Sequence, residues 1–508
     1  MENDWLRNFT IMDTITNYKL IIAPLIPVVT GLLVMIFGKR PNLRETCMVC
    51  GAVATFVTVA SLFPHVLAGG SYDYNLVTLY PGISLRFHLD GLGLIFSGIA
   101  STLWIFAAFY CIGYMRGLNE HAQTRFYFCY AVSVGAGVGA AFSGSLVTLY
   151  LFYEIISIIT YPLVMHHQDE EGYSGGRKYI IYLMFASKAF LLPAMVLTYV
   201  ICGTLDFATA GVVVGIFPAG ADSVLVNVTY ILFLFGFAKA AIMPLHNWLP
   251  DAMVAPTPVS ALLHAVVVVK VGVFSICRIM LSVFGVDLLS RSGLGLFTAY
   301  LVSFTIICAS VIAITKNDLK ARLAYSTVSQ LSYVILGVAM LTPHSITGGL
   351  MHIANHGFAK ITLFFAAGAI FVASGRKKIS ELGGIGYRMP FTMAAFGLAS
   401  LSMIGIPPVA GFVSKWYLAL GAVDIHDNII LAVIILSSLL NAGYFVPIFL
   451  TAFFGDPPTG EIAVSGSLER TPLMALMVVP LFLTALISVL IGLWPEFLFR
   501  ITRLMGGS

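Results

Sequence analysis

Apolar runs of roughly 20 residues recur along the whole chain and are separated by short polar connections. A helix of about that length spans the hydrocarbon core of a bilayer. The pattern therefore predicts an all-α polytopic membrane protein with about fourteen transmembrane helices. The helices are expected near 20–38, 45–68, 90–113, 126–143, 145–165, 179–203, 225–255, 257–284, 294–315, 321–341, 346–374, 389–423, 428–454 and 471–498.

Two of these runs are too long for one simple span, and prolines interrupt both. The run 225–255 contains Pro244 and Pro250, and the run 389–423 contains Pro407 and Pro408. Proline removes a backbone hydrogen bond and kinks or breaks a helix. Because paired broken helices in corresponding halves of a transporter mark its transport site, we expect the functional site near these two breaks.

The two breaks fall in the seventh and twelfth predicted helices. This spacing predicts two inverted five-helix repeats, helices 4–8 and helices 9–13, each with a broken helix. The chain then divides into helices 1–3 with a periplasmic loop (1–125), the first repeat (126–284), the second repeat (285–454) and the C-terminal helix 14 (455–508).

Basic residues are unevenly distributed between the two sides of this topology. The connections after odd-numbered helices hold fifteen Lys and Arg residues, and the opposite side holds seven. Because cytoplasmic loops carry the excess of Lys and Arg, the odd-numbered connections are predicted to be cytoplasmic. Both termini are then on the outer side of a prokaryotic-type inner (cell) membrane. The seven are Arg7, Lys19, Arg86, Arg278, Arg291, Arg500 and Arg503.

Composition supports the membrane class and narrows the chemistry. Charged residues make up 10% of the chain, against about 25% in soluble domains. The net charge of +4 is modest and gives no reason to expect a nucleic-acid partner. The seven cysteines of the chain lie mostly inside apolar runs, where small packing residues are expected. We see no redox-cofactor or nucleotide motif, so we expect no cofactor in this chain and an energy source in its partners.

Five lysines fall inside apolar runs: Lys188, Lys239, Lys270, Lys360 and Lys415. A charged residue at the bilayer centre costs at least about 2.5 kcal/mol. Five unpaired lysines would therefore cost more than about 12 kcal/mol, which is comparable to the net stability of a typical protein. They must face one another, a carboxylate or water.

One carboxylate, Glu154 in Leu149-Tyr-Leu-Phe-Tyr-Glu-Ile-Ile-Ser157, lies clearly inside an apolar run, so the buried lysines outnumber the local acids. Burial and like-charge repulsion favour the neutral form of lysine. Such lysines gain and lose protons near neutral pH, and we expect them to form a proton path. Lys188 is interpreted as a modulator between Glu154 and Lys239.

Lys239 and Lys415 flank the two breaks. Lys239 is expected about a turn and a half before Pro244, and Lys415 follows Gly405-Ile-Pro-Pro408. The alternative for either lysine is that its charged end reaches the membrane interface. The intervening His246, Trp248 and Asp251 are expected to shape the first break and its interface rather than to carry protons.

His352, His356 and Lys360 follow the spacing i, i+4, i+8 and are expected on one face of a helix. A ladder of groups that change charge near neutral pH suits a proton wire. The alternative is a polar stripe that joins helices, and no acidic third ligand accompanies the pair to indicate a metal site. His264 and Lys270 are six residues apart and do not share a face, yet they can enter one channel from adjacent sides. For His264 the alternative is a hydrogen-bonded core histidine.

The segment Asn317-Asp-Leu-Lys-Ala-Arg-Leu-Ala-Tyr-Ser326 and the hydroxyl-rich residues after it are interpreted as structural. The charges are ordinary loop charges in this interpretation, and the small and hydroxyl residues suit close helix packing.

Together these segments resemble the antiporter-like subunit family. That family supplies the proton-pumping membrane subunits of respiratory complex I, of membrane-bound hydrogenases and of Mrp-type multisubunit cation/proton antiporters. The resemblance covers nearly the whole chain. It rests on Phe87-His-Leu-Asp-Gly91, Glu154, the block from Lys239 to His264, Asp318-Leu-Lys-Ala-Arg-Leu-Ala-Tyr-Ser326, His352 with His356 and Lys360, and Gly405-Ile-Pro-Pro408.

The resemblance implies roles for these residues. It makes Glu154 and Lys239 the paired gate of a first half-channel and Lys415 the terminal residue of a second. It assigns the central hydrated axis to His264 or Lys270, followed by His352, His356 and Lys360.

The resemblance also implies partners, namely other membrane subunits, including related antiporter-like ones. The chain ends at Ser508 without the long lateral helix of the largest complex I member. Together with Ser414-Lys-Trp-Tyr417, this favours the antiporter and hydrogenase branch, with sodium transport left open.

Three functions remain to be separated. The leading hypothesis is a proton-translocating subunit of a larger complex. The alternatives are a stand-alone secondary transporter of an ion or small solute, which broken helices permit, and a structural subunit with vestigial polar groups. The polar residues run laterally through the chain rather than around one pocket, and five buried lysines are costly, which favours the first hypothesis.

Overall fold

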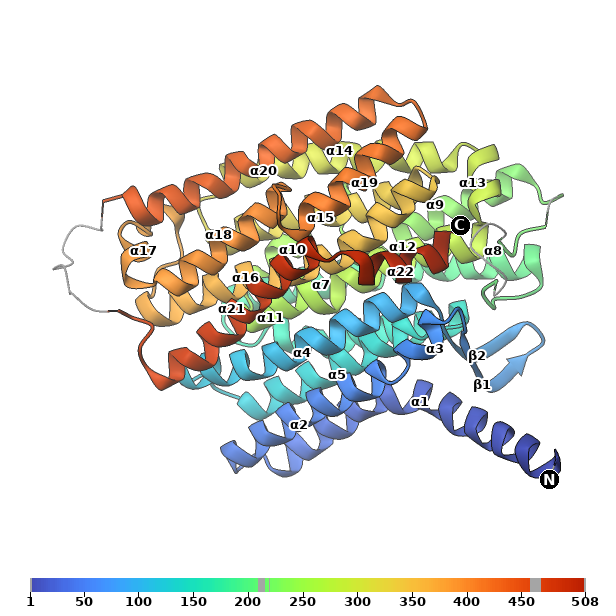
Figure 1. Ribbon diagram of the computed structural model, residues 1–508, viewed down its shortest axis with the longest axis horizontal. Coiled ribbons are helices and arrows are strands. Elements are labelled where there is room, and N and C mark those ends of the chain that lie inside the picture. Colours follow the sequence, from blue (N-terminus) through green and yellow to red (C-terminus); the bar gives the residue numbers. More distant parts are fainter. Residues whose placement is uncertain (1, 209–214, 219, 457–466, 507–508) are drawn as a thin grey trace.

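The computed structural model describes residues 2–208, 215–218, 220–456 and 467–506, and most of them are helical. Figure 1 shows the helices running side by side along the long axis of the molecule. The two ends of the described chain lie at the same end of this bundle, where a small β-hairpin also projects (Figure 1).

The N-terminal half holds the hairpin and the first broken helix. Its elements are α1 (Glu2–Ile36), α2 (Pro41–Ala60), α3 (Phe63–Leu67), β1 (Tyr72–Tyr80), β2 (Ile83–Leu89), α4 (Gly91–Gly117), α5 (Gln123–Ala141), α6 (Leu146–Val164), α7 (Glu170–Ala186), α8 (Leu192–Cys202), α9 (Ser223–Gly236), α10 (Trp248–Asp251), α11 (Thr257–Ala261) and α12 (Val268–Ile279).

The C-terminal half holds the longest unbroken central helix and the second broken helix. Its elements are α13 (Val286–Arg291), α14 (Leu294–Thr315), α15 (Leu319–Ala339), α16 (Pro343–Ser374), α17 (Ile385–Arg388), α18 (Pro390–Ile404), α19 (Ala410–Asp424), α20 (Asn428–Phe454), α21 (Pro472–Leu493) and α22 (Glu496–Gly506). Single π-helical turns join α7 to α8 (Ser187–Leu191) and α11 to α12 (Leu262–Val266), and a third follows α12 (Met280–Phe284).

Ten helical segments of the described chain are long and apolar enough to cross a bilayer, which confirms the all-α polytopic class. They differ in how deeply they lie in the bundle. The most apolar stretch of the segment Thr257–Phe284 is 100% buried, and that of α16 is 78% buried, whereas that of α20 is only 33% buried. The polar residues predicted in the eighth and eleventh helices therefore belong to the centre of the bundle.

Aspartate and hydroxyl side chains begin several of these helices. Asp90 accepts a hydrogen bond from the Gly93 backbone at the start of α4, and Asp318 accepts one from Ala321 at the start of α15. Such caps satisfy the free N–H groups of a first helical turn. The cap confirms a structural role for Asp318.

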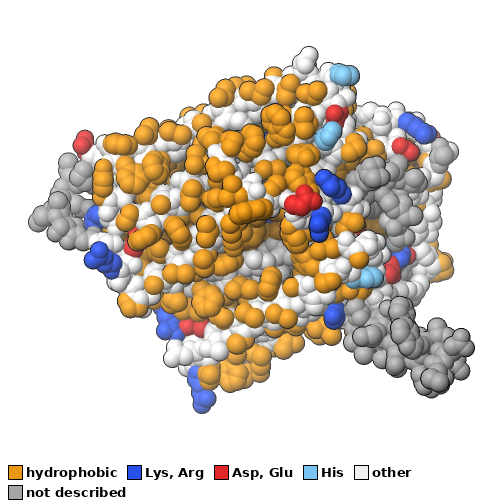
Figure 2. Space-filling model, viewed as in Figure 1, with side chains coloured by type: hydrophobic (Ala, Val, Ile, Leu, Met, Phe, Trp, Pro, Cys, Tyr) orange, Lys and Arg blue, Asp and Glu red, His pale blue; other side chains and the backbone are white. Residues whose placement is uncertain are grey.

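The connections after the odd-numbered members of the fourteen predicted transmembrane helices, a numbering that differs from the labels in Figure 1, all meet at one end of the bundle. Contacts link each of these connections to the next: Arg116 pairs with Glu45, Arg125 donates to the His166 carbonyl, Lys178 pairs with Asp251, Lys320 donates to the Ala255 carbonyl, Asn317 contacts Ser380, and the Leu468 backbone donates to the Arg388 carbonyl. Figure 2 shows charged side chains toward the two ends and a broad apolar surface between them.

The opposite end carries the hairpin, where the apolar pattern predicts only a loop. Strands β1 and β2 are antiparallel, and Asp73 pairs with Arg86 and His88 across them. Burial alone would raise the pKa of Asp73, but hydrogen bonds from His88 and Arg86 lower it below its ordinary value.

One basic residue of the outer-side count does not lie in a loop in the described chain. Arg278 was counted as an outer loop charge, but it lies in α12 with 2% of its side chain exposed and forms a two-pronged ion pair with Asp90. Buried arginine needs such a partner, because an unpaired buried charge is costly. The side chain of Arg7 lies outside the described residues.

The first helix break begins earlier than its prolines predict. Helix α9 already ends at Gly236, Lys239 lies in a 3₁₀ turn (Ala238–Ala240), and Ala241 adopts a left-handed conformation with φ 54°. Pro250 lies inside the short helix α10. The prediction of Lys239 within a helix before Pro244 was therefore wrong. The irregular backbone of the break surrounds the lysine itself.

The second break follows its prolines closely. Helix α18 ends at Ile404, Gly405 has φ 91°, and α19 begins at Ala410 after Pro407 and Pro408. A positive φ suits glycine, which has no Cβ to clash. Here the prediction of a break at Pro407 and Pro408 is confirmed.

Candidate functional site: a row of buried lysines and histidines

Lys239 is fully buried in the first break and is held by one residue of α6. Its Nζ donates to the Tyr153 carbonyl and lies over the Tyr153 ring, while its backbone N–H donates to the Tyr153 hydroxyl at 3.2 Å. Trp248 braces the same turn, because its indole N–H donates to the Ala238 carbonyl at 3.1 Å. This role agrees with the prediction that Trp248 shapes the break.

Glu154 pairs with Lys188 rather than with Lys239. Its Oε2 lies 2.7 Å from Lys188 Nζ. Within the described chain no ion pair of 4.0 Å or less joins Glu154 to Lys239. Successive residues of a helix point about 100° apart, so Tyr153 faces the break while Glu154 faces the π-helical turn that carries Lys188. The Glu154–Lys239 ion pair that the resemblance implies is therefore absent from the described structure, where Glu154 pairs with Lys188 instead. Both Glu154 and Lys188 still act on Lys239 electrostatically.

Lys188 departs from the other four lysines in burial. Its side chain is 46% exposed, and its Nζ also donates to the Tyr150 hydroxyl at 2.6 Å. Lys239, Lys270, Lys360 and Lys415 are all at most 5% exposed. The expectation of five buried lysines thus holds for four, and the fifth reaches the lateral surface of the bundle.

Helix α12 connects the first break to α16. Gly272 packs on the break so closely that an added Cβ would lie 2.5 Å from the carbonyl carbon of Lys239. On another side of α12, the Nζ of Lys270 occupies the space that a Cβ on Gly357 would need. Glycine at position 357 therefore brings the Lys270 amine against α16, beside His356.

His264 and Lys270 both face α16, as their spacing allowed. The His264 ring lies in a π-helical turn, 4.8 Å from the ring of Phe364. Phe364 and Gly357 are seven residues apart and lie on the same face of α16. Insertions of this π-helical kind often occur at functional sites.

The predicted polar face of α16 is confirmed. His352, His356 and Lys360 are each at most 1% exposed, and the two imidazole centroids are 6.3 Å apart. His356 lies one turn from His352 and next to Gly357, where the Lys270 amine packs, so it lies between these two members of the row. Lys360 Nζ donates to Ser326 Oγ, so the segment interpreted as purely structural also contributes to the site.

Lys415 lies in α19 and reaches back across the second break. Its Nζ donates to the carbonyls of Met403 and Ile404, both at 2.9 Å, and to Ser438 Oγ at 3.2 Å. These carbonyls end α18 and have no further helical partner. A cavity of about 490 Å³ lies beside this lysine and is lined by Gly405, Trp416 and Ser438 among others.

A hydrogen-bond network joins Lys415 to His352. Gln330 Nε2 donates to the same Met403 carbonyl at 3.2 Å, and Gln330 Oε1 lies 3.0 Å from His352 Nε2. The other ring nitrogen of His352 lies 2.9 Å from Ser414 Oγ. Hydrogen bonds therefore connect the second break directly to the polar face of α16.

Several buried polar atoms along the row have no hydrogen-bond partner among the described residues. They are Glu154 Oε1, both ring nitrogens of His264, Lys270 Nζ and both ring nitrogens of His356. Buried polar groups normally have a protein or water partner.

Sequence reasoning missed four contributors. Tyr153, Gln330 and the Asp90–Arg278 pair hold or support the row. Tyrosine and glutamine are uncharged, so placing them in an apolar run does not carry the large burial cost that singles out a lysine. Asp90 and Arg278 are 188 positions apart, so no local pattern joins them.

Known proteins resemble this chain in sequence and in fold. A family model described as "NADH:quinone oxidoreductase/Mrp antiporter, TM" matches residues 143–441, a range that contains every predicted site residue. The chain is 32% identical over 471 residues to NADH-quinone oxidoreductase subunit N of Desulforudis audaxviator (strain MP104C), covering 87% of this chain and 90% of that protein.

A second relative is the A/B component of a probable K(+)/H(+) antiporter of Rhizobium meliloti (strain 1021), with 30% identity over 84% of this chain and 43% of that protein. Two solved structures share the fold. A chain of the Mrp complex from Dietzia sp. DQ12-45-1b matches with a TM-score of 0.84, 22% identity and 97% of both chains covered. A chain of the membrane-bound sulfane sulfur reductase, an archaeal respiratory membrane complex, matches with a TM-score of 0.81, 22% identity and 96% of both chains covered.

Proposed function

Because the chain belongs to the NADH:quinone oxidoreductase/Mrp antiporter family of membrane proteins, we propose that it is a proton-translocating integral membrane subunit of a multisubunit complex. Respiratory, hydrogenase and Mrp-type complexes are the classes that fit. The observation that carries the proposal is the buried row from Glu154 and Lys239, through Lys270 and His356, to Lys415.

The row supports proton transfer because its members are ionisable, buried and linked. Lys239, inside the first break, donates to the Tyr153 carbonyl of the neighbouring helix α6, whereas Lys415 donates to the carbonyls that end α18. Carbonyls hold an ammonium without fixing its charge by an ion pair, so a proton can leave. Water at the unpartnered atoms of Lys270 and His356 bridges the middle of the row. Protons then move between two half-channels through the α16 face.

The steps follow from the charges around Glu154. When Glu154 is paired with Lys188, its field on Lys239 is partly cancelled. Moving that carboxylate toward Lys239 favours the protonated lysine there. Releasing it again sends the proton toward Lys270 and His356. The energy for this switch comes from partner subunits.

The exposed Lys188 supports such partners. It lies in the middle of the membrane-spanning segment Glu170–Cys202. Contact between its amine and lipid would cost at least about 2.5 kcal/mol. A neighbouring membrane protein of the complex that covers the Lys188–Tyr150 surface removes this cost. A stand-alone transporter has no such partner, and purification of the chain alone in an active form would favour that alternative.

The finer topology is part of the proposal. It comprises fourteen spans, inverted repeats at 126–284 and 285–454, segments 1–125 and 455–508 outside them, and both termini on the outer side. The charge count supports this orientation, because the connections after the odd-numbered predicted helices hold fifteen basic residues against seven on the other side. Labelling of single cysteines tests this orientation: Lys39→Cys should react from the cytoplasm and Asn75→Cys from outside, and the reverse pattern contradicts it.

Proton transport by the native complex in sealed vesicles tests the function. Lys239→Ala and Glu154→Gln should each lower transport at least about tenfold, the lower range for losing a proton-transfer group. Lys178→Ala is the matched control, because Lys178 is 54% exposed and pairs with Asp251 at the end of the bundle. If both variants insert normally and transport like the parent, the proposal is wrong.

A further inference from the structure

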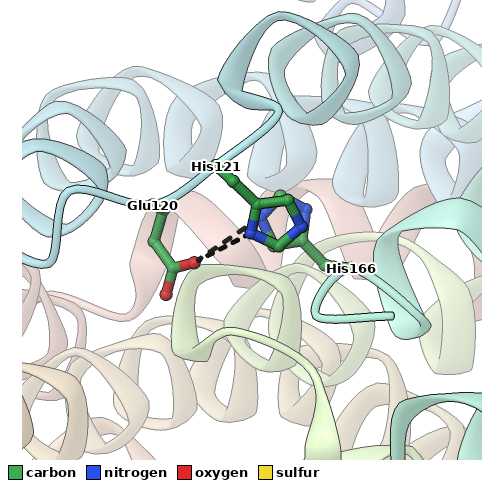
Figure 3. Close-up of side chains that lie close together, drawn as sticks. All are labelled: Glu120, His121 and His166. Atoms are coloured by element: carbon green, nitrogen blue, oxygen red, sulfur yellow. Dashed lines mark ion pairs between the residues drawn. The ribbon is translucent and has the colours of Figure 1, made fainter. Parts of the chain in front are cut away.

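Three imidazoles surround one carboxylate at the end of the bundle that holds the odd-numbered connections. Glu120 follows α4, whereas His166 and His167 follow α6. Glu120 Oε2 lies 3.7 Å from His166 Nε2, 3.7 Å from His167 Nδ1 and 4.0 Å from His121 Nδ1. Figure 3 shows Glu120, His121 and His166 turned toward one another from two separate loops.

His166 gives the independent sign of a missing ligand. Its side chain is 0% exposed, yet neither ring nitrogen has a hydrogen-bond partner among the described residues. Leaving a buried polar group unsatisfied costs about 1–3 kcal/mol. An ion bound between His166 and Glu120 would remove that cost.

We propose that Glu120, His121 and His166, with His167 as a fourth candidate ligand, bind a divalent transition-metal ion of the zinc class. One ligand atom from each of Glu120, His121 and His166 lies within 4.8 Å of the others. Tetrahedral zinc with bonds of about 2.0–2.1 Å places its ligand atoms roughly 3.3 Å apart. Small side-chain rotations therefore close the site.

The donor set selects the metal. Imidazole nitrogens suit zinc, copper, nickel and iron, whereas magnesium and calcium prefer oxygen ligands. One face of the site is open, because His121 is 48% exposed and His167 is 34% exposed. An ion can therefore enter from solvent while the buried His166 holds it from inside.

The site borders a cavity of about 730 Å³ that Glu120 and His167 line together with Asp251, Thr257 and Lys320. Thr257 begins the fully buried central segment that carries His264 and Lys270. A bound dication at this mouth repels protons that enter the cavity. Metal binding is therefore expected to slow proton transport, although the site itself does not depend on that function.

Zinc binding to the untagged native complex tests the site. Equilibrium dialysis with zinc chloride should show one more bound zinc per complex in the parent than in Glu120→Gln or His121→Asn. Removing one ligand should weaken this site at least about tenfold, since losing even an outer partner of a ligand costs 10–100-fold. Magnesium chloride should bind equally to parent and variants.

His344→Asn is the matched control, because His344 is 50% exposed and pairs with one carboxylate, Asp424, at the opposite end of the bundle. It should bind zinc like the parent. If the complex assembles with His166→Asn, this variant tests the buried ligand and should also lose the zinc. If it does not assemble, the exposed His121 still allows the site to be tested through His121→Asn. Parent-like zinc binding by Glu120→Gln and His121→Asn, or no zinc bound by the parent, overturns the proposal.

Discussion

The two broken helices hold their lysines in opposite ways. Lys239 lies inside the first break, where the carbonyl of Tyr153 on a neighbouring helix accepts its amine and the charge of Glu154 lies close by. Lys415 lies beyond the second break and turns back to the last carbonyls of α18. Within the described chain no carboxylate lies within 4.0 Å of Lys415. Lys239 thus has a carboxylate in its surroundings, whereas Lys415 is held by backbone carbonyls and the Ser438 hydroxyl.

Under the proposed function, this difference gives the two breaks different roles in proton transfer. In the proposed function, the Glu154 carboxylate exchanges Lys188 for Lys239 and so changes the charge at the first break. The second break has fixed backbone acceptors and a direct network through Gln330 to His352. We infer that the first break is the regulated end of the row and the second is its outlet.

Glycine contacts support both breaks, and their loss should have the largest effect. A Cβ on Gly272 would overlap the backbone of Ala240, and a Cβ on Gly411 would overlap the carbonyl oxygen of Ser402. Gly272→Ala and Gly411→Ala should each lower the free energy of unfolding by about 3 kcal/mol, the upper range for overpacking.

Thermal unfolding of the detergent-solubilised complex measures this effect. Gly443→Ala is the control, because a Cβ there would have only Ile314 within 4 Å, at 3.7 Å. Equal melting temperatures for all three variants would mean that the breaks are not supported by these contacts.

Gln330→Leu should have the next largest effect, and only at the second break. It removes the link between Lys415 and His352 and leaves His352 Nε2 without that partner. Proton transport should fall about tenfold. Ser310→Ala is the control, because Ser310 is equally buried but bonds Ser329 away from the row. Normal transport by Gln330→Leu would remove the proposed outlet.

Lys188→Met should have the smallest effect, and only at the first break. Without Lys188, Glu154 acts on Lys239 alone and favours its protonated form, so release slows. Transport should fall about three- to fivefold, less than for loss of Lys239 itself. Lys178→Met, measured in the same vesicles, should transport like the parent. Faster transport by Lys188→Met would reverse the role assigned to the Glu154–Lys188 pair.

Much of the fold and four of the buried lysines are predictable because burial in lipid imposes a strong constraint. A run of 20 apolar residues has few alternatives to a spanning helix, and a lysine within it must have a function or a partner. The i, i+4, i+8 spacing also placed His352, His356 and Lys360 correctly on one face of α16.

Contacts between side chains of helices far apart in the sequence could not be predicted. Glu154 is 34 positions from Lys188 and 85 from Lys239, and which of them it faces depends on the rotation of α6. The length of the first break was missed because α9 ends at Gly236, before any proline. The Glu120–His166 cluster was missed because two separate loops form it.

The central claim is that Lys239 and Lys415 carry protons rather than a fixed positive charge. Arginine keeps its proton in proteins, so Lys→Arg preserves the charge and abolishes release. Proton transport by the native complex in vesicles should therefore fall at least about tenfold in both Lys239→Arg and Lys415→Arg, as in the alanine variants. Transport near the parent rate in the arginine variants, with loss only in alanine variants, would show that these lysines supply charge alone.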